Sequence, residues 1–150
     1  MGDFDPDVFL TATLTEANST QSIPVDAGEY PAIAEEVETR PWQGKKDPSK
    51  SGISLDIQWN IDSAEQRQKL GREKVIVRQS IMIDLNESKG IDTGKGKNVR
   101  LGRLREAVGL NTPGQPFNFL MLKGKAAKVK VEQRPEGDVI YNDVTAVAAL

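Results

Sequence analysis

The sequence contains no cysteine and no histidine among its 150 residues. Without cysteine, disulfides, thiolate nucleophiles and Cys-ligated zinc are excluded. Without histidine, the commonest general base and the commonest metal ligand are missing, so Ser-His-Asp and Cys-His chemistry are excluded too. We therefore expect a protein that acts by binding and not as an enzyme, with no catalytic residue, no cofactor and no metal.

Long apolar runs are also missing, since no stretch approaches the ~20 apolar residues of a membrane span. The chain starts MGDFD, which is acidic where a signal peptide is basic. The apolar fraction of 37% and the charged fraction of 28% fit a globular chain of one domain. We therefore expect a cytoplasmic protein with no membrane partner.

Charge is distributed unevenly along the chain, although the formal net charge is only −2. Residues 1–39 contain nine acidic residues and no Lys or Arg, whereas residues 89–130 contain ten basic and two acidic residues. Such asymmetry is typical of proteins that meet nucleic acids or other anionic surfaces. A solvated surface with scattered lysines is the alternative interpretation.

Composition divides the chain in two. Residues 1–27 are rich in Asp, Thr, Ser and Asn, which predicts an acidic, mostly irregular N-terminal arm before one domain over 28–150. Apolar residues alternate with polar ones in the domain. This pattern predicts strands over residues 29–39, 53–61, 74–83, 125–133 and 139–148.

Four further features complete the predicted fold. Ile33 and Val37 should share one face of the first strand, and Trp59 lies in phase with the apolar residues of the second, so we expect it in the core. Residues 40–52 are rich in Pro, Gly and Lys and predict a loop, and residues 117–122 are a short apolar segment that could form another strand.

A helix is predicted over residues 98–108, with Asn98 as its N-cap and one apolar face. Three strands, a helix and a two-stranded hairpin follow one another in the order of an OB-fold. The predicted fold class is therefore all-β with one short helix, a five-stranded OB-fold barrel with the helix between strands 3 and 4.

Four short segments of the domain have a recognisable order. They are AGEY at 27–30, Gly52 before the alternating strand 53–61, RLGRLREAVGL at 100–110, and LKGK at 122–125 leading through strand 129–131 to YNDV at 141–144. In these segments the chain resembles the phage single-stranded DNA-binding proteins grouped with an uncharacterised phage replication family. The resemblance covers about four-fifths of the chain, and its motifs are largely structural.

The resemblance implies an OB-fold that coats and protects single-stranded DNA during phage replication or recombination, with weak sequence selectivity. It implies single-stranded DNA as the partner, with replication or recombination proteins and further copies of the chain as additional candidates. Bacterial single-strand binders end in an acidic tail with an aromatic tip, whereas this sequence ends VAAL. Partner recruitment would then fall to the acidic N-terminal arm.

Single-strand binding needs cations for phosphates and exposed rings for bases, and the predicted loop over 40–52 supplies both. Its candidate residues are Arg40, Trp42, Lys45, Lys46 and Lys50. We expect Trp42 to stack on bases, the alternative being that it packs on the barrel.

Further candidates lie on outward strand positions and in a basic loop: Arg78, Lys95, Lys97, Lys128, Lys130 and Tyr141. Arg78 faces outward on the third strand, where a solvated arginine is the alternative. Lys128 and Lys130 share a face of the fourth strand, although lysines there also prevent edge pairing. Lys95 and Lys97 precede a helix N-terminus that could receive a phosphate, but their loop, GIDTGKG, lacks the spacing of a nucleotide-binding loop.

Two other functions remain open at this point. A structural β-domain of a phage virion or tail would bind protein instead of DNA. A recombination accessory protein or small nuclease would need carboxylates for a metal, and Asp56, Asp62 and Asp84 show no recognisable ligand spacing.

Overall fold

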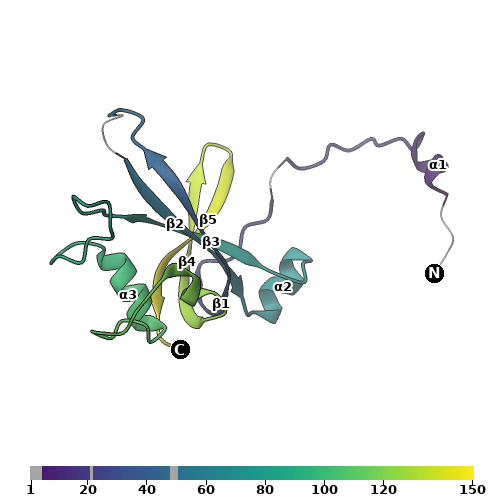
Figure 1. The fold of residues 1–150 in the computed structure, drawn as a ribbon. Coiled ribbons are helices and arrows are strands. Elements are labelled where there is room, and N and C mark those ends of the chain that lie inside the picture. Colours follow the sequence, from purple (N-terminus) through teal and green to yellow (C-terminus); the bar gives the residue numbers. More distant parts are fainter. Residues whose placement is uncertain (1–4, 21, 48–50) are drawn as a thin grey trace.

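A computed structural model describes residues 5–20, 22–47 and 51–150, and five strands form its central barrel (Figure 1). The strands are β1 (Gly28–Gln43), β2 (Ser51–Ile61), β3 (Ile76–Ile83), β4 (Ala126–Glu136) and β5 (Val139–Ala148). They close in the order β1-β2-β3-β5-β4, with all neighbours antiparallel except β3 and β5. The predicted all-β, five-stranded barrel of the OB type is therefore confirmed.

Helix α3 (Val99–Ala107) lies between β3 and β4, as predicted, and buries Leu101 and Leu104. Helix α2 (Ala64–Leu70), between β2 and β3, adds to the predicted single helix. The Ser63 hydroxyl accepts a hydrogen bond from the Gln66 N–H at its start, and Gly71 at its end has φ +66°. A capping hydroxyl and a left-handed glycine are sufficient to delimit so short a helix.

The apolar segment 117–122, which could have formed another strand, does not do so. Residues Phe119–Leu122 form a 3₁₀ helix, η1, and the Asn118 side chain accepts a hydrogen bond from the Met121 N–H at its start. This local side-chain bond offers the backbone an alternative to strand pairing.

No helix in the described ranges is long and apolar enough to cross a membrane.

The core consists of the inward side chains of all five strands together with those of α3 and η1. Trp59 is completely buried, which confirms its predicted place, and its indole N–H donates to the Gln79 side-chain oxygen at 2.9 Å. A buried indole needs such a partner, because an unpaired N–H in the core costs about 1–3 kcal/mol. Gln79 is itself 3% exposed, so it is part of the core despite its polarity.

A β-bulge in β1 determines which of its side chains face outward. The register with β2 shifts between Ala34 and Glu36, so Glu35 is an extra residue and the alternation inverts after it. Ile33 is 48% exposed, whereas Val37 pairs with the buried Ile57 and contributes to the core. The prediction that Ile33 and Val37 share a face is therefore wrong.

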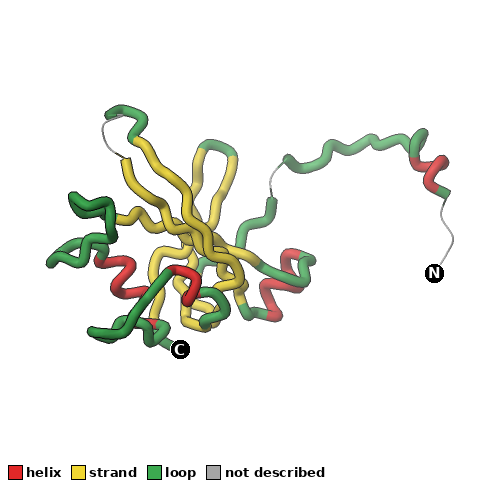
Figure 2. Tube along the Cα trace, viewed as in Figure 1, coloured by secondary structure: helices red, strands yellow, loops and turns green. Residues whose placement is uncertain are grey.

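The predicted loop over 40–52 is also too long, because β1 continues to Gln43 and β2 begins at Ser51. Trp42 pairs with Gly52 near the end of this hairpin. The β4–β5 hairpin turns at Gly137, which has φ +62° and suits a tight turn. Both hairpins extend from the same end of the barrel (Figure 2).

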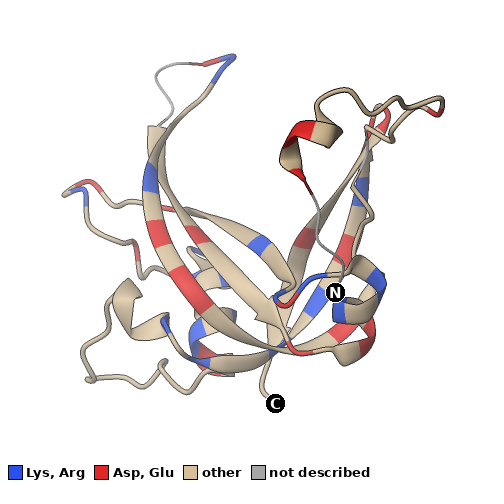
Figure 3. Cartoon of the chain, turned by 90° about the vertical axis from the view of Figure 1, so that its right-hand side faces the viewer, with Lys and Arg blue, Asp and Glu red and all other residues tan. Residues whose placement is uncertain are grey.

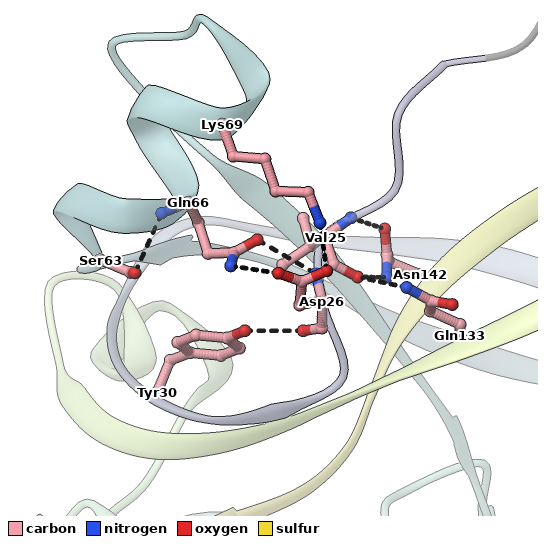
Figure 4. Close-up of polar contacts among 8 residues, drawn as sticks. All are labelled: Val25, Asp26, Tyr30, Ser63, Gln66, Lys69, Gln133 and Asn142. Carbon is pink, nitrogen blue, oxygen red and sulfur yellow. Dashed lines mark hydrogen bonds and ion pairs between the residues drawn. The ribbon is translucent and has the colours of Figure 1, made fainter.

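Two residues attach the base of the N-terminal arm to the barrel (Figure 4). Val25 is 4% exposed, its N–H donates to the Asn142 side chain at 2.8 Å, and its carbonyl accepts from Gln133 and Asn142 at 3.0 and 2.9 Å. The attached part of the chain therefore starts before Gly28, inside the segment predicted as an arm. Residues 5–20, by contrast, are exposed and lead away from the barrel (Figure 1).

Asp26 connects the same point to α2. Its N–H donates to the Gln66 side chain at 3.1 Å, and its carboxylate accepts from the Gln66 amide at 2.8 Å and pairs with Lys69. The hydrogen bonds from Lys69 and Gln66 lower the pKa of Asp26. The Tyr30 hydroxyl donates to the Asp26 carbonyl at 2.7 Å, so β1 holds this residue as well.

Candidate nucleic-acid interface

The outer surface of β1, β2 and β3 carries a compact group of charged, hydroxyl and ring side chains. Register pairing places Arg40 opposite Ser54, Asp56 opposite Ser80, and Gln58 opposite Arg78. Directly paired residues of neighbouring strands point to the same side of a sheet. We call this surface the arginine face, and its residues are Arg40, Trp42, Ser54, Asp56, Arg78, Ser80 and Met82.

Asp56 is the centre of the arginine face. Its Oδ2 accepts from Arg40 Nε at 2.7 Å and from Arg78 Nη2 at 2.8 Å. Its Oδ1 accepts from the hydroxyls of Ser54 at 3.0 Å and Ser80 at 2.8 Å. The side chain of Asp56 is only 6% exposed, so a nearly buried carboxylate is fully hydrogen-bonded by three strands.

The charge of Asp56 follows from these contacts. Burial would raise its pKa, but hydrogen bonds from Ser80, Arg40, Ser54 and Arg78 outweigh burial and lower the pKa to about 2. The carboxylate is therefore ionised at neutral pH. The exposed side chains of Glu38, opposite Asp56, and Glu36, opposite Gln58, lie on the same side of the sheet, so the two guanidinium groups have acidic neighbours besides Asp56.

The two arginines remain open to solvent, with side-chain exposures of 54% for Arg40 and 57% for Arg78. A guanidinium has five N–H donors, and the contact with Asp56 uses one from each residue. The shared carboxylate of Asp56 thus fixes both guanidinium groups from the side of the sheet and leaves their other N–H groups available to a ligand. Pre-positioned guanidinium groups of this kind suit phosphate oxygens, because little side-chain freedom is lost on binding.

Trp42 lies on the same side of β1 as Arg40, two residues further along. It is 37% exposed and pairs with Gly52, where a Cβ would come within 3.9 Å of the indole ring and 3.4 Å of the Ile83 carbonyl. These are ordinary van der Waals distances, so the ring packs beside Gly52 while part of it remains accessible. Met82, 43% exposed, adds an apolar side chain to this surface.

The remaining predicted residues of the β1–β2 connection lie beyond the arginine face. Lys45 and Lys46 are exposed after the end of β1, and Lys50 lies outside the described residues. The structure therefore brings Arg40 and Trp42 onto a strand and leaves Lys45 and Lys46 at the tip of the hairpin.

Lys95 and Lys97 are exposed in the loop between β3 and α3. Asn98 occupies the N-cap position of α3 but has φ 52° and makes no side-chain cap bond, so the predicted cap interaction is wrong. Its side chain instead accepts from the Asp84 N–H at 2.7 Å and donates to the carbonyls of Asp84 and Asp92 at 2.9 and 2.8 Å. The residue organises the basic loop and leaves the helix N–H groups uncapped by its side chain.

Lys128 and Lys130 lie on the outer side of β4, which pairs with residues 28–33 of β1, whereas Arg40 and Trp42 of the arginine face lie further along β1. Each has an acidic neighbour, with Lys128 3.5 Å from Glu29 and Lys130 3.5 Å from Glu132. This pair, which we call the β4 lysines, is therefore locally neutralised. Figure 3 shows the same mixture of basic and acidic residues along the strands.

Tyr141 lies in the β4–β5 hairpin and is 46% exposed. The Arg134 guanidinium carbon is 5.0 Å from the centre of its ring, and Arg134 itself pairs with Asp143 at 2.8 Å and Glu136 at 2.7 Å. A cation already covers part of the ring, so Tyr141 offers less surface to a base than its sequence position suggests.

Sequence reasoning missed the part that Asp56 plays. The sequence suggested Asp56 only as a metal-binding carboxylate, whereas in the structure it anchors two arginines. The two other acids considered with it also have protein partners. Asp62 pairs with Arg67 at 3.3 Å, and Asp84 accepts from the Asn98 N–H at 3.1 Å. Across the part of the chain that the structure describes, no three acidic side chains gather where they could hold a metal ion. The available signal was an acid at the middle of the most regular strand, flanked by serine at Ser54.

The chain matches no protein-family model and no curated protein with which it was compared. The fold and the arginine face therefore provide the basis for a functional proposal.

Proposed function

We propose that the chain is a non-enzymatic single-stranded DNA-binding protein whose binding surface is the arginine face. The observation that carries this proposal is the pair Arg40 and Arg78, held by the nearly buried Asp56 beside the partly exposed ring of Trp42. Fixed cations beside a ring are what a single strand requires, because phosphates meet the cations and unpaired bases stack on the ring.

The arrangement favours a single strand over a duplex for a physical reason. In a duplex the bases are stacked on one another and only their edges are open, so a ring such as Trp42 finds no free base. Contacts between arginine and phosphate carry no sequence information, and every base has a face that can stack. The expected binding is therefore weakly selective for sequence.

Coating and protecting single strands during phage replication or recombination is the biological role we propose. The OB-type barrel supports it, since this architecture commonly places ligands on the side formed by strands 2 and 3 and its flanking loops. The sequence resemblance to phage single-strand binders adds the phage context. The two hairpins that extend from one end of the barrel would flank a bound strand (Figure 2).

Equilibrium titration of dye-labelled oligo-dT at several salt concentrations tests the proposal. With roughly four to six phosphate contacts, the slope of log K against log salt should be about −3 to −4, at about −0.7 for each phosphate. A duplex of equal length is the matched control and should bind more weakly at every salt concentration.

Three other outcomes would each contradict the proposal. A slope near zero would remove its electrostatic basis. Absence of binding to single and double strands alike would favour a structural β-domain that binds protein. Cleavage of the oligonucleotide in the presence of a divalent metal would indicate a nuclease.

A further inference from the structure

A hollow of about 70 Å³ lies between α3, β3 and β5, beyond the residues that sequence reasoning assigned to the site. Its lining includes Gln79, Arg100, Arg103 and Thr145. The hollow adjoins the arginine face, because Arg100 Nη1 donates to the Ser80 carbonyl at 3.4 Å and the Ser80 hydroxyl contacts Asp56. A strand that crosses β3 on the arginine face would meet this hollow next.

The buried polar side chain in the lining is Gln79. An indole N–H can only donate, so the atom that meets Trp59 at 2.9 Å is the amide oxygen of Gln79. Trp59 thereby fixes the amide and leaves its NH₂ group as the part available to the hollow. Gln79 is 3% exposed, so this donor belongs to a rigid part of the core and not to a mobile surface chain.

The other polar groups of the hollow are also donors. Arg100 and Arg103 lie three residues apart on α3, both are exposed, and Thr145 adds a hydroxyl from β5. No acidic residue lines this hollow, although Glu106 lines an adjoining one together with Arg103. Two guanidinium groups, an amide NH₂ and a hydroxyl select an anion with several acceptor oxygens, and a phosphate has that chemistry.

We propose that this hollow is a second phosphate subsite, which holds the backbone of the single strand after it leaves the arginine face and crosses towards α3. The inference rests on the proposed function and extends it by naming Arg100 and Arg103 as binding residues. The bound strand is thus longer than the arginine face alone could accommodate.

The test compares the double variant Arg100→Gln/Arg103→Gln with the wild type in oligo-dT titrations at several salt concentrations. Loss of two phosphate contacts should make the slope of log K against log salt shallower by about 1.4, at about 0.7 for each contact. The charge-preserving variant Arg100→Lys/Arg103→Lys should keep most of the wild-type slope.

The matched control is Arg67→Gln/Arg72→Gln, which removes the same charge at and just after α2, on the other side of the barrel (Figure 1). Its slope should equal that of the wild type. Circular dichroism checks that each variant is folded. If the double variant does not fold, Arg103→Gln alone replaces it, and its slope of log K against log salt should be shallower by about 0.7.

The outcomes separate the two proposals. A wild-type protein that binds no oligo-dT overturns the proposed function and this subsite with it. A wild-type protein that binds, with an unchanged slope in Arg100→Gln/Arg103→Gln, overturns the subsite alone. An equal loss in the α2 control would also overturn it, because the effect would then reflect overall charge and not a local contact.

Discussion

The arginine face and the β4 lysines each contain two basic side chains on the outside of one barrel, yet their surroundings differ. Arg40 and Arg78 share a single acid, Asp56, whose side chain is 6% exposed. Lys128 and Lys130 each have an acid of their own, with side-chain exposures of 58% for Glu29 and 49% for Glu132. In the first group one nearly buried acid fixes the geometry of both cations, whereas the second group consists of two separate, exposed ion pairs.

The comparison teaches that charge along a sequence is a poor guide to charge on a surface. The β4 lysines belong to the most basic segment of the chain, but their acidic partners come from residues far away in sequence or on the same strand. The arginine face draws its cations from β1 and β3, on either side of β2. Only the strand order of the barrel brings Arg40 and Arg78 together.

The largest effect should come from removing the arginines together with their acid. In Arg40→Gln/Asp56→Asn/Arg78→Gln no buried carboxylate is left unpaired, and loss of two charge-assisted contacts should weaken oligo-dT binding about 100-fold, at roughly 1.5 kcal/mol for each contact. Fluorescence anisotropy measures the change. The matched variant Lys128→Gln/Lys130→Gln should weaken binding less than about threefold, because exposed ion pairs contribute little.

Equal losses in these two variants would contradict the distinction between the two surfaces. The outcome would mean that binding depends on overall charge, and the β4 lysines would then belong to the interface.

An intermediate effect is expected at Trp42. Removing a ring that stacks on a base costs about 1–3 kcal/mol, so Trp42→Ala should weaken binding about tenfold. Lys45→Ala, at the tip of the same hairpin, should have a smaller effect, since one exposed cation is screened by salt. The stability of Trp42→Ala should stay close to that of the wild type because the ring is 37% exposed.

Intrinsic fluorescence provides a separate measurement on the same ring. The chain has only two tryptophans, and Trp59 is completely buried. Oligo-dT should quench the wild type and leave Trp42→Phe nearly unchanged. Quenching that persists in Trp42→Phe would show that the wild-type signal does not come from Trp42, and the stacking role would be lost.

The smallest expected effect concerns stability and not DNA binding, and it comes from the protonation of Asp56 at acid pH. Its folded-state pKa of about 2 lies below its ordinary value near 4, so its stabilising contribution is complete above pH 4 and disappears as the pH falls through 2. The free energy of unfolding of the wild type should therefore fall by about 2 kcal/mol more than that of Asp56→Asn over this range.

Urea denaturation at several pH values measures this difference. Asp62→Asn is the control, because it removes one carboxylate at a side chain that is 71% exposed. Asp26, whose pKa is also lowered, is present in every variant and cancels in the comparison. Parallel pH curves for wild type and Asp56→Asn would show that the contacts of Asp56 do not stabilise the fold.

The barrel could be predicted from the sequence because its strands carry a local signal. The alternation that ends in Trp59 and Ile61 identifies β2 and its buried side without any knowledge of its neighbours. The bulge at Glu35 has no such signal, and neither has the length of β1, because strand pairing outweighs the local preference of Pro41 for a loop.

Half of the candidate site could be predicted and the other half could not. Arg40 and Trp42 could be predicted from residue type in the segment read as a loop, and Arg78 from its outward position on the third strand. Asp56 was missed as an anchor because its partners lie 16 and 22 residues away, on strands whose register the sequence does not determine. The β4 lysines were included for the same reason, since their acidic neighbours depend on how the barrel closes.

The bulge in β1 determines whether the even-numbered residues after it face the core or the solvent. Ala32 and Ala34 point into the core, so a regular strand would carry every even-numbered residue inward, Arg40 and Trp42 included. The one extra residue reverses this order for the rest of the strand. The outward orientation of Arg40 and Trp42 thus depends on how many residues separate them from Ala34. Deleting residue 35 would reverse it, whereas replacing the side chain of Glu35 would not.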